Sequence, residues 1–124
     1  MISLDTPLIS LQAVLAGAPA TSQPECHVWY YDVPAQAKET NEEYKIFMYR
    51  SVANSGTDVV ICPAPTTSGT TRHIVCFAYH NKDTASVVLV IKTDDGTTER
   101  VMLKKTLTTL QTLWYDSNSV PTLI

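Results

Sequence analysis

The chain has 124 residues, which suits one domain and is long enough to bury a core without disulfide bonds or a metal. Twelve acidic against nine basic residues give a net charge of −3, whereas a general nucleic-acid binder needs a concentrated basic surface. Because no apolar run could span a membrane and no Lys or Arg precedes the first apolar segment as in a secretory signal, we expect folding in a reducing cytosol.

The first part of the chain predicts an arm followed by a strand. Residues 1–8 contain Ile, Leu and Pro with few charges, so we expect an arm that either lies on a neighbouring subunit or frays. In residues 9–15, Ile, Leu and Ala alternate with residues that include Ser10 and Gln12, which predicts a half-buried strand. Gly17 follows and ends it.

Residues 26–33 form the next predicted strand, which is rich in aromatic side chains. Trp29 and Tyr31 share one of its faces, and Tyr30 lies on the other. Because such aromatics are typical of cores and subunit interfaces, we take Trp29 and Tyr31 as candidate interface residues. A stacking platform for carbohydrate is the alternative. Residues 35–43 are polar and too short for a stable independent helix, so we expect a long exposed loop.

The middle of the chain predicts three strands, residues 44–53, 57–62 and 72–81, separated by segments rich in turn-forming residues. The third is apolar on both faces, as in a strand that is central in a sheet or covered by a partner subunit. Regular alternation places Ile74, Cys76 and Ala78 on one face and Val75, Phe77 and Tyr79 on the other. We take Phe77 and Tyr79 as further candidate interface residues.

The last third predicts strands at residues 85–93, 97–107 and 110–115, followed by a tail, residues 116–124. The first of these strands is again apolar on both faces, and the Asp-Asp-Gly sequence at 94–96 predicts the hairpin turn that follows it. The second strand is expected to face inward with three apolar side chains, Val101, Leu103 and Leu107, while Met102 interrupts the alternation.

About eight short strands at intervals of about 10 to 15 residues, joined by turns, are typical of a sandwich. We therefore predict an all-β fold, a single-domain antiparallel β-sandwich over residues 1–124 that resembles a jelly roll. The arm, 1–8, and the tail, 116–124, flank it.

Three cysteines, Cys26, Cys62 and Cys76, cannot all pair within one chain, and their apolar surroundings predict buried free thiols. Cys76 also belongs to the candidate metal ligands, with His73 and His80. In a regular strand Cys76 and His80 share a face and His73 lies on the other, so the three do not converge. We predict no metal site and no cofactor.

Catalytic patterns are also missing from the sequence. There is no Gly-x-Ser-x-Gly nucleophile elbow, and none of the four glycines falls at the spacing of a phosphate-binding loop. Asp32 and the acidic pairs at 42–43 and 94–95 could serve acid–base chemistry, but neighbouring acids in loops are typical of a solvated surface. We therefore predict that the protein is not an enzyme.

Several short motifs follow one another in a specific order. They are Tyr-His-Asn-Lys-Asp-Thr-Ala at 79–85, Asp-Gly-Thr-Thr at 95–98, Arg-Val-Met-Leu-Lys-Lys-Thr-Leu at 100–107 and Gln-Thr-Leu-Trp-Tyr at 111–115. With Leu-Gln-Ala-Val-Leu-Ala-Gly-Ala at 11–18 and Pro-Ala-Pro at 63–65, this order resembles a recurrent domain of small virion proteins from tailed bacteriophages. The resemblance covers about half of the chain, and residues 25–50 have no counterpart in it.

The resemblance implies a β-sandwich built into a virus particle, with no catalytic residues. On that basis we expect a capsid decoration (cement) protein that is made in the host bacterial cytoplasm and resides in the virion. It would bind the outer capsid surface as a homotrimer, with the major capsid protein or other virion proteins as partners and with neither nucleic acid nor membrane. The alternatives are a neck, tail or fibre-attachment subunit, with glycan contact through Trp29 or Tyr31, and a small metal-dependent hydrolase.

Overall fold

The computed structural model describes residues 2–17, 19–34, 44–52, 57–116 and 121–124, and the described residues form ten strands. In chain order these are β1 (Ile2–Leu4), β2 (Ser10–Leu15), β3 (Glu25–Val33), β4 (Phe47–Val52), β5 (Val59–Cys62), β6 (Thr71–His80), β7 (Val87–Asp94), β8 (Glu99–Leu107), β9 (Thr112–Asp116) and β10 (Thr122–Leu123). The predicted all-β fold is confirmed, with two short strands beyond the eight expected.

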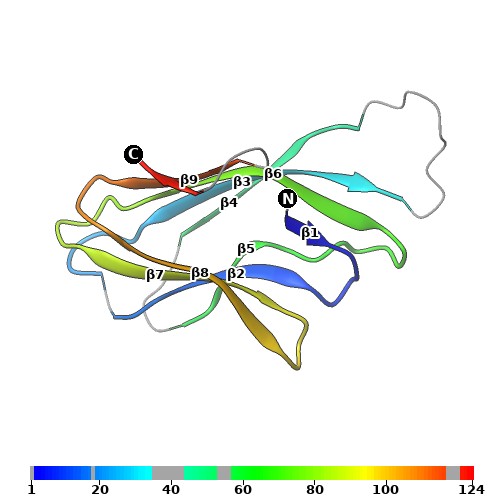
Figure 1. Ribbon diagram of the computed structural model, residues 1–124, viewed down its shortest axis with the longest axis horizontal. Coiled ribbons are helices and arrows are strands. Elements are labelled where there is room, and N and C mark those ends of the chain that lie inside the picture. Colours follow the sequence, from blue (N-terminus) through cyan, green and yellow to red (C-terminus); the bar gives the residue numbers. More distant parts are fainter. Residues whose placement is uncertain (1, 18, 35–43, 53–56, 117–120) are drawn as a thin grey trace.

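The strands form two antiparallel sheets that pack face to face (Figure 1). One sheet has the order β10-β9-β6-β3-β4, and β1 pairs with β6 beside that path; the other has the order β5-β2-β7-β8. β6 is the centre of the first sheet. It pairs with β3 along one edge, while its other edge is shared by β9 and β1.

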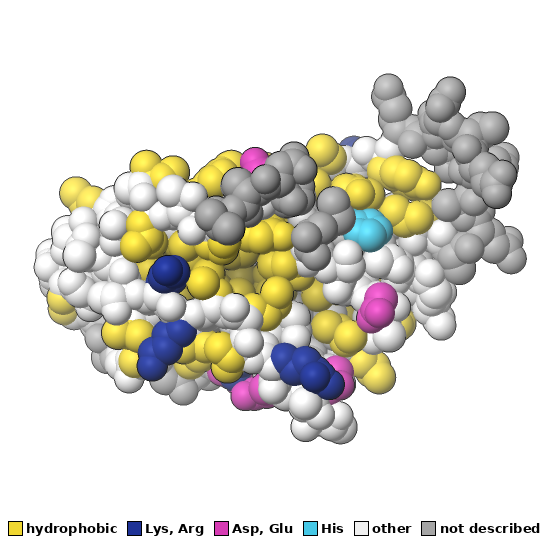
Figure 2. All heavy atoms as spheres, in the orientation of Figure 1, with side chains coloured by type: hydrophobic (Ala, Val, Ile, Leu, Met, Phe, Trp, Pro, Cys, Tyr) yellow, Lys and Arg dark blue, Asp and Glu magenta, His cyan; other side chains and the backbone are white. Residues whose placement is uncertain are grey.

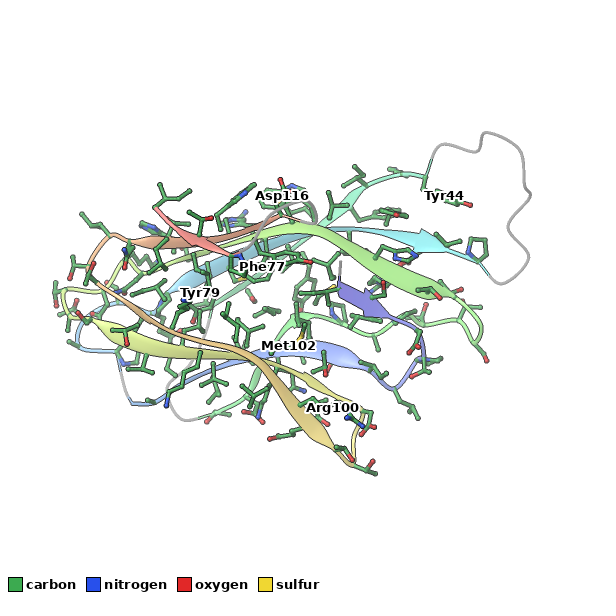
Figure 3. The ribbon with its side chains drawn as sticks, viewed as in Figure 1. Tyr44, Phe77, Tyr79, Arg100, Met102 and Asp116 are labelled. Carbon is green, nitrogen blue, oxygen red and sulfur yellow. The ribbon has the colours of Figure 1, made fainter. Side chains whose placement is uncertain are left out.

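The core lies between the sheets and follows from alternation along the strands. Leu11, Ala13 and Leu15 of β2 are buried, as the sequence predicted, and the buried side chains of β7 continue the same face. Phe77 and Tyr79 reach down from β6 between the two layers (Figure 3). Each large apolar side chain buried in this way stabilises the fold by roughly 1.5–3 kcal/mol relative to its exposed state.

A β-bulge at Val75 corrects the predicted faces of β6. Trp29 pairs with Cys76 and Tyr30 with Ile74, so Val75 has no partner of its own on β3. One extra residue reverses the alternation beyond it. Ile74 therefore faces inward together with the side chains that follow at 77 and 79, whereas Val75 and Cys76 are both directed outward.

A second bulge, at Met102, corrects β8. Ile91 pairs with Leu103 and Lys92 with Val101, so Met102 is the extra residue. The inward prediction for Val101 is wrong, because this side chain is 67% exposed. Leu103 does pack against the core, and Leu107 at the end of β8 is buried, as expected.

Both terminal segments contribute strands. The expected arm contains β1, whose Ile2 and Leu4 are buried against the core, so this part does not project from the molecule. Within the expected tail, β10 pairs with β9, and Ile124 and Thr112 exchange two backbone hydrogen bonds. The predicted loop at 35–43 lies outside the described residues.

Two buried polar residues, Asn81 and Asp83, join three connections at one end of the sandwich. The Asn81 amide donates to the carbonyl oxygens of Ala85 (3.0 Å), Leu107 (3.1 Å) and Thr108 (3.1 Å). The Asp83 carboxylate accepts hydrogen bonds from the backbone N–H groups of residues 20, 21, 22 and 84. These bonds satisfy backbone groups that the turns leave without ladder partners.

Candidate functional site

The outer face of the β10-β9-β6-β3-β4 sheet carries a group of aromatic and aliphatic side chains that the fold directs away from the core. We call it the outer aromatic face and define it by Trp29, Tyr31, Tyr44, Ile46, Met48, Val75 and Trp114. On β3, Trp29 lies between its cross-strand partners, Met48 of β4 and Cys76 of β6. Ile46 and Met48 are 55% and 49% exposed.

The strand geometry explains why these side chains gather there. Trp29 and Tyr31 alternate with inward residues along β3, and Met48 stands opposite Trp29 on the edge strand β4. The bulge in β6 adds Val75 to this face, next to Cys76, where a regular strand would have turned one of the two inward. The bulge therefore enlarges the apolar area of the face.

Two shallow depressions mark the outer aromatic face. One, of about 180 Å³, is lined by Trp29, Ile46, Val75, Cys76 and Trp114. The other, of about 390 Å³, lies beside it and is lined by Tyr31, Val33, Tyr44, Ile46 and Val75. Ile46 and Val75 border both depressions, so the two are parts of one continuous surface.

Ring contacts arrange the aromatic side chains of this face. The Trp29 and Trp114 ring centroids are 6.3 Å apart and tilted by 51°. Tyr31 stacks on Tyr44 at 5.8 Å and on His73 at 5.0 Å. The His73 Nδ1 atom lies 2.9 Å from the hydroxyl of a serine in β1, which holds the imidazole in place. Aromatic pairs in these geometries attract one another beyond the area that they bury.

The four candidate interface residues divide into two groups. Trp29 and Tyr31 are half-buried and lie on the outer aromatic face, together as predicted. Phe77 and Tyr79 are buried in the core and do not lie on the outer aromatic face with the other two. Tyr44, Ile46 and Met48 alternate in the sequence, and this alternation was a further signal for the face.

The suggested ligands His73, Cys76 and His80 lie differently from the prediction, because the bulge puts all three on the outer side of β6. They are still spread along the strand, with about 3.3 Å for each residue, too far apart to share one ion. The His80 Nδ1 atom lies 2.8 Å from the hydroxyl of Thr112. Among the described residues, these three do not form a group with ligand atoms close enough for a metal.

Another group of described residues does have ligand atoms close enough to hold a metal ion. It consists of Asp58, Asp94 and Glu99, whose carboxylate oxygens lie within 4.8 Å of one another. The Lys92 ammonium is placed among them, with Nζ 2.8 Å from Asp58 and 2.9 Å from Glu99. Burial lowers the pKa of Lys92, but these hydrogen bonds outweigh it and the pKa is raised. Lys92 therefore supplies the positive charge at this cluster.

The three cysteines are free thiols, as predicted. Cys26 and Cys62 are buried, and burial raises the pKa of Cys26 strongly and that of Cys62 to about 12. Cys76 is half-buried and lines the smaller depression, and its pKa is also raised, mainly by burial and further by Asp116. A thiol with a raised pKa holds little thiolate at neutral pH and is a poor nucleophile.

None of the protein-family models, curated proteins or solved structures compared with this chain matches it. Within the residues described by the structure, no helix is long and apolar enough to cross a membrane.

Proposed function

We propose that this protein is a structural component of a tailed-bacteriophage virion, a decoration protein that binds the outer capsid surface and stabilises it. The observation that carries the proposal is the outer aromatic face. This face gives a small sandwich a broad apolar surface that could bind another virion protein. The ordered motifs at 79–85, 95–98, 100–107 and 111–115 are the second support for the proposal.

The chemistry of the outer aromatic face fits a protein partner. Its depressions are lined by apolar and aromatic side chains, which dominate the energetics of protein interfaces once water is excluded. Ile46 and Met48 are exposed beside the half-buried Trp29, so the patch has both a fixed aromatic centre and an accessible rim. Burying such a patch on the capsid would hold neighbouring capsid subunits together. A homotrimer on the capsid is the arrangement that we propose.

Rebinding to particles tests the role of the face. Purified Met48→Glu protein is added to particles that were produced without this protein, and bound copies are counted by quantitative mass spectrometry. We expect a loss of binding of about tenfold or more, because a carboxylate inside the interface would be desolvated without a partner. The matched control is Leu8→Glu, at a side chain that is 71% exposed and not part of the face.

Copy number and location test the capsid assignment itself. Cryo-electron microscopy of the parent particle should show many copies over the capsid exterior, and particles that lack the protein should open at lower temperature. A low, ring-like copy number at one vertex would contradict the decoration role.

The second candidate is a neck, tail or fibre-attachment subunit that contacts host glycans. The tilted Trp29–Trp114 pair favours it, because half-buried indole rings that line a depression provide stacking surfaces. Location at the tail, with binding of host-cell polysaccharide that is lost in Trp114→Ala, would support this candidate over the first.

A further inference from the structure

The sandwich is open along one side, where β8 is the edge strand of its sheet. β8 pairs with β7 on one edge and with none of the described strands on the other. In Figure 1 this open side faces the viewer, with β8 in the lower layer and β9 and β1 in the upper one. An unpaired edge presents backbone N–H and C=O groups that another strand can bind.

An apolar cleft lies beside this edge and reaches the core. It has a volume of about 370 Å³ and is lined by Ile2, Phe77, Ile91, Met102, Leu103, Tyr115 and Pro121. Figure 2 shows hydrophobic side chains gathered in the middle of this face between the two layers, with Lys and Arg side chains beside them. Met102, at the bulge in β8, stands at the border of the cleft (Figure 3).

Two cations flank the cleft from the inner side of β8. Arg100 pairs with Thr93, which itself pairs with the core residue Leu11, and Lys105 pairs with the core residue Leu89. Both therefore project from the face of the sheet that is turned toward the core, and both are exposed at its open edge. Lys104 adds a third positive charge on the opposite face of the same strand.

The acidic groups near β8 neutralise these cations only in part. Glu99 points to the other face and is paired with Lys92. Asp95, in the preceding turn, is the described acid whose charge interacts with Arg100. Within the described part of the chain, Lys104 and Lys105 form no salt bridge. The edge therefore combines an apolar centre with positive ends.

We propose that the β8 edge and the adjoining cleft bind an extended segment of a partner protein in which an apolar side chain is flanked by acidic ones. The segment adds as a further strand to β8, places its apolar side chain in the cleft and pairs its carboxylates with Arg100 and Lys105. This is recognition by strand addition, with affinity from backbone hydrogen bonds and specificity from side-chain pockets.

The positive charge of β8 favours an acidic segment of a partner over β8 of a second copy of this chain. Pairing two copies of β8 would gather six cations, from Arg100, Lys104 and Lys105 of each chain, along one short ribbon. Lysines on an edge strand oppose such self-pairing. The same cations attract an acidic segment. Protection of the edge against self-pairing does not require an apolar cleft, whereas an incoming segment can bury an apolar side chain there.

The probe is a ten-residue peptide with the central sequence Glu-Thr-Val-Thr-Glu, in which the valine and both glutamates share one face of an extended strand. It is N-methylated at alternate positions so that it cannot aggregate. Binding to the full chain is measured by fluorescence anisotropy, and amide hydrogen exchange and chemical shifts are followed by NMR. We expect binding that slows exchange along residues 100–106 of β8. The double variant Arg100→Glu/Lys105→Glu should bind at least about tenfold more weakly, while Lys45→Glu, next to the opposite edge strand, should bind as the wild type does.

Matched peptides separate the contributions. Serine in place of valine should weaken binding, and so should lysine in place of glutamate or N-methylation at every residue. Equal binding of the lysine peptide, unchanged binding by the double variant, or shifts confined to the outer aromatic face would overturn the proposal. Tighter occupation of the cleft by decanoate, with no protection of β8 amides, would also overturn it, because the site would then accept an acyl chain.

Discussion

Arg72 and Asp32 form a two-point ion pair between the neighbouring strands β6 and β3. Arg72 Nε lies 2.8 Å from Asp32 Oδ1, and its Nη2 lies 2.9 Å from Oδ2. The guanidinium also covers the Tyr30 ring, 4.1 Å from its centroid, and donates a hydrogen bond of 2.7 Å to the carbonyl oxygen of Pro63. One buried cation thus connects β3, β6 and the connection that follows β5.

Replacing Asp32 with Asn should lower the free energy of unfolding by about 2 kcal/mol, because charge-assisted hydrogen bonds to a buried cation are lost. Arg72→Lys should also destabilise the fold, since an ammonium cannot form the planar two-point contact or stack on Tyr30 in the same way. Urea unfolding followed by circular dichroism measures both changes. Equal stability of Arg72→Lys and wild type would show that only the charge matters.

Cysteine reactivity should report the burial of the three thiols. In the native protein at pH 8, we expect a thiol reagent such as DTNB to modify Cys76 more slowly than free cysteine, because burial raises the pKa of this thiol. Cys26 and Cys62 should react only after unfolding, when all three thiols are titrated. Cys76→Ser should abolish the native reaction. Rapid modification of two or more thiols in the folded protein would contradict this assignment.

Acid should weaken the fold through Asp83. Burial raises the pKa of this carboxyl, but the backbone N–H groups of Ala20, Thr21, Ser22 and Thr84 outweigh burial and hold the pKa well below its usual range. A lowered folded-state pKa stabilises the protein above the unfolded-state value, near 3.8, and this contribution is lost as pH falls toward the folded-state value.

The matched variant for this test is Asp83→Asn, which keeps the size of the side chain and removes its charge. We expect wild type to unfold at a higher temperature than Asp83→Asn at pH 6, and the difference to shrink as pH falls below about 4. Differential scanning calorimetry between pH 2 and pH 7 measures it. A difference that stays constant over this range would mean that the charge of Asp83 contributes nothing.

Removing the cation at residue 92 should create a dependence on divalent metal. Lys92→Met leaves Asp58, Asp94 and Glu99 close together without the ammonium among them. We expect a loss of stability of roughly 1–2 kcal/mol, partly restored by millimolar Ca²⁺, which prefers carboxylate oxygens. The melting temperature with Ca²⁺ or with EDTA is the measurement.

Wild-type protein serves as the control for this variant, because Lys92 already occupies the position and its melting temperature should not respond to Ca²⁺. Adding Asp94→Asn to Lys92→Met should remove the response of the single variant. An equal effect of Ca²⁺ on wild type would contradict the view that Lys92 satisfies these carboxylates.

The local residue pattern was sufficient to predict where the main strands lie. The alternation in 9–15 predicted β2 with its buried Leu11, Ala13 and Leu15, because a period of two places alternate side chains on one face. The same rule failed at Val75, and in β8, where Met102 interrupts the alternation, it placed Val101 on the wrong face. A bulge adds one residue to a strand only relative to its partner, so the sequence of one strand does not reveal it.

The residues of the candidate surface could likewise be predicted only in part. The sequence placed Trp29 and Tyr31 on one face, and that holds in the structure, but it also offered Phe77 and Tyr79 for an interface. These two side chains are in the core because the bulge changed the phase of β6 and turned them toward the second sheet.

The sequence by itself determined that this protein is an antiparallel β-sandwich, because hydrophobic period and turn residues act within a few residues of each other. Only the tertiary structure decided which apolar side chains form the core, which form the outer aromatic face and which line the cleft beside β8. Those outcomes depend on pairings such as Asp32 with Arg72, which lie 40 residues apart, and on bulges that exist only between paired strands.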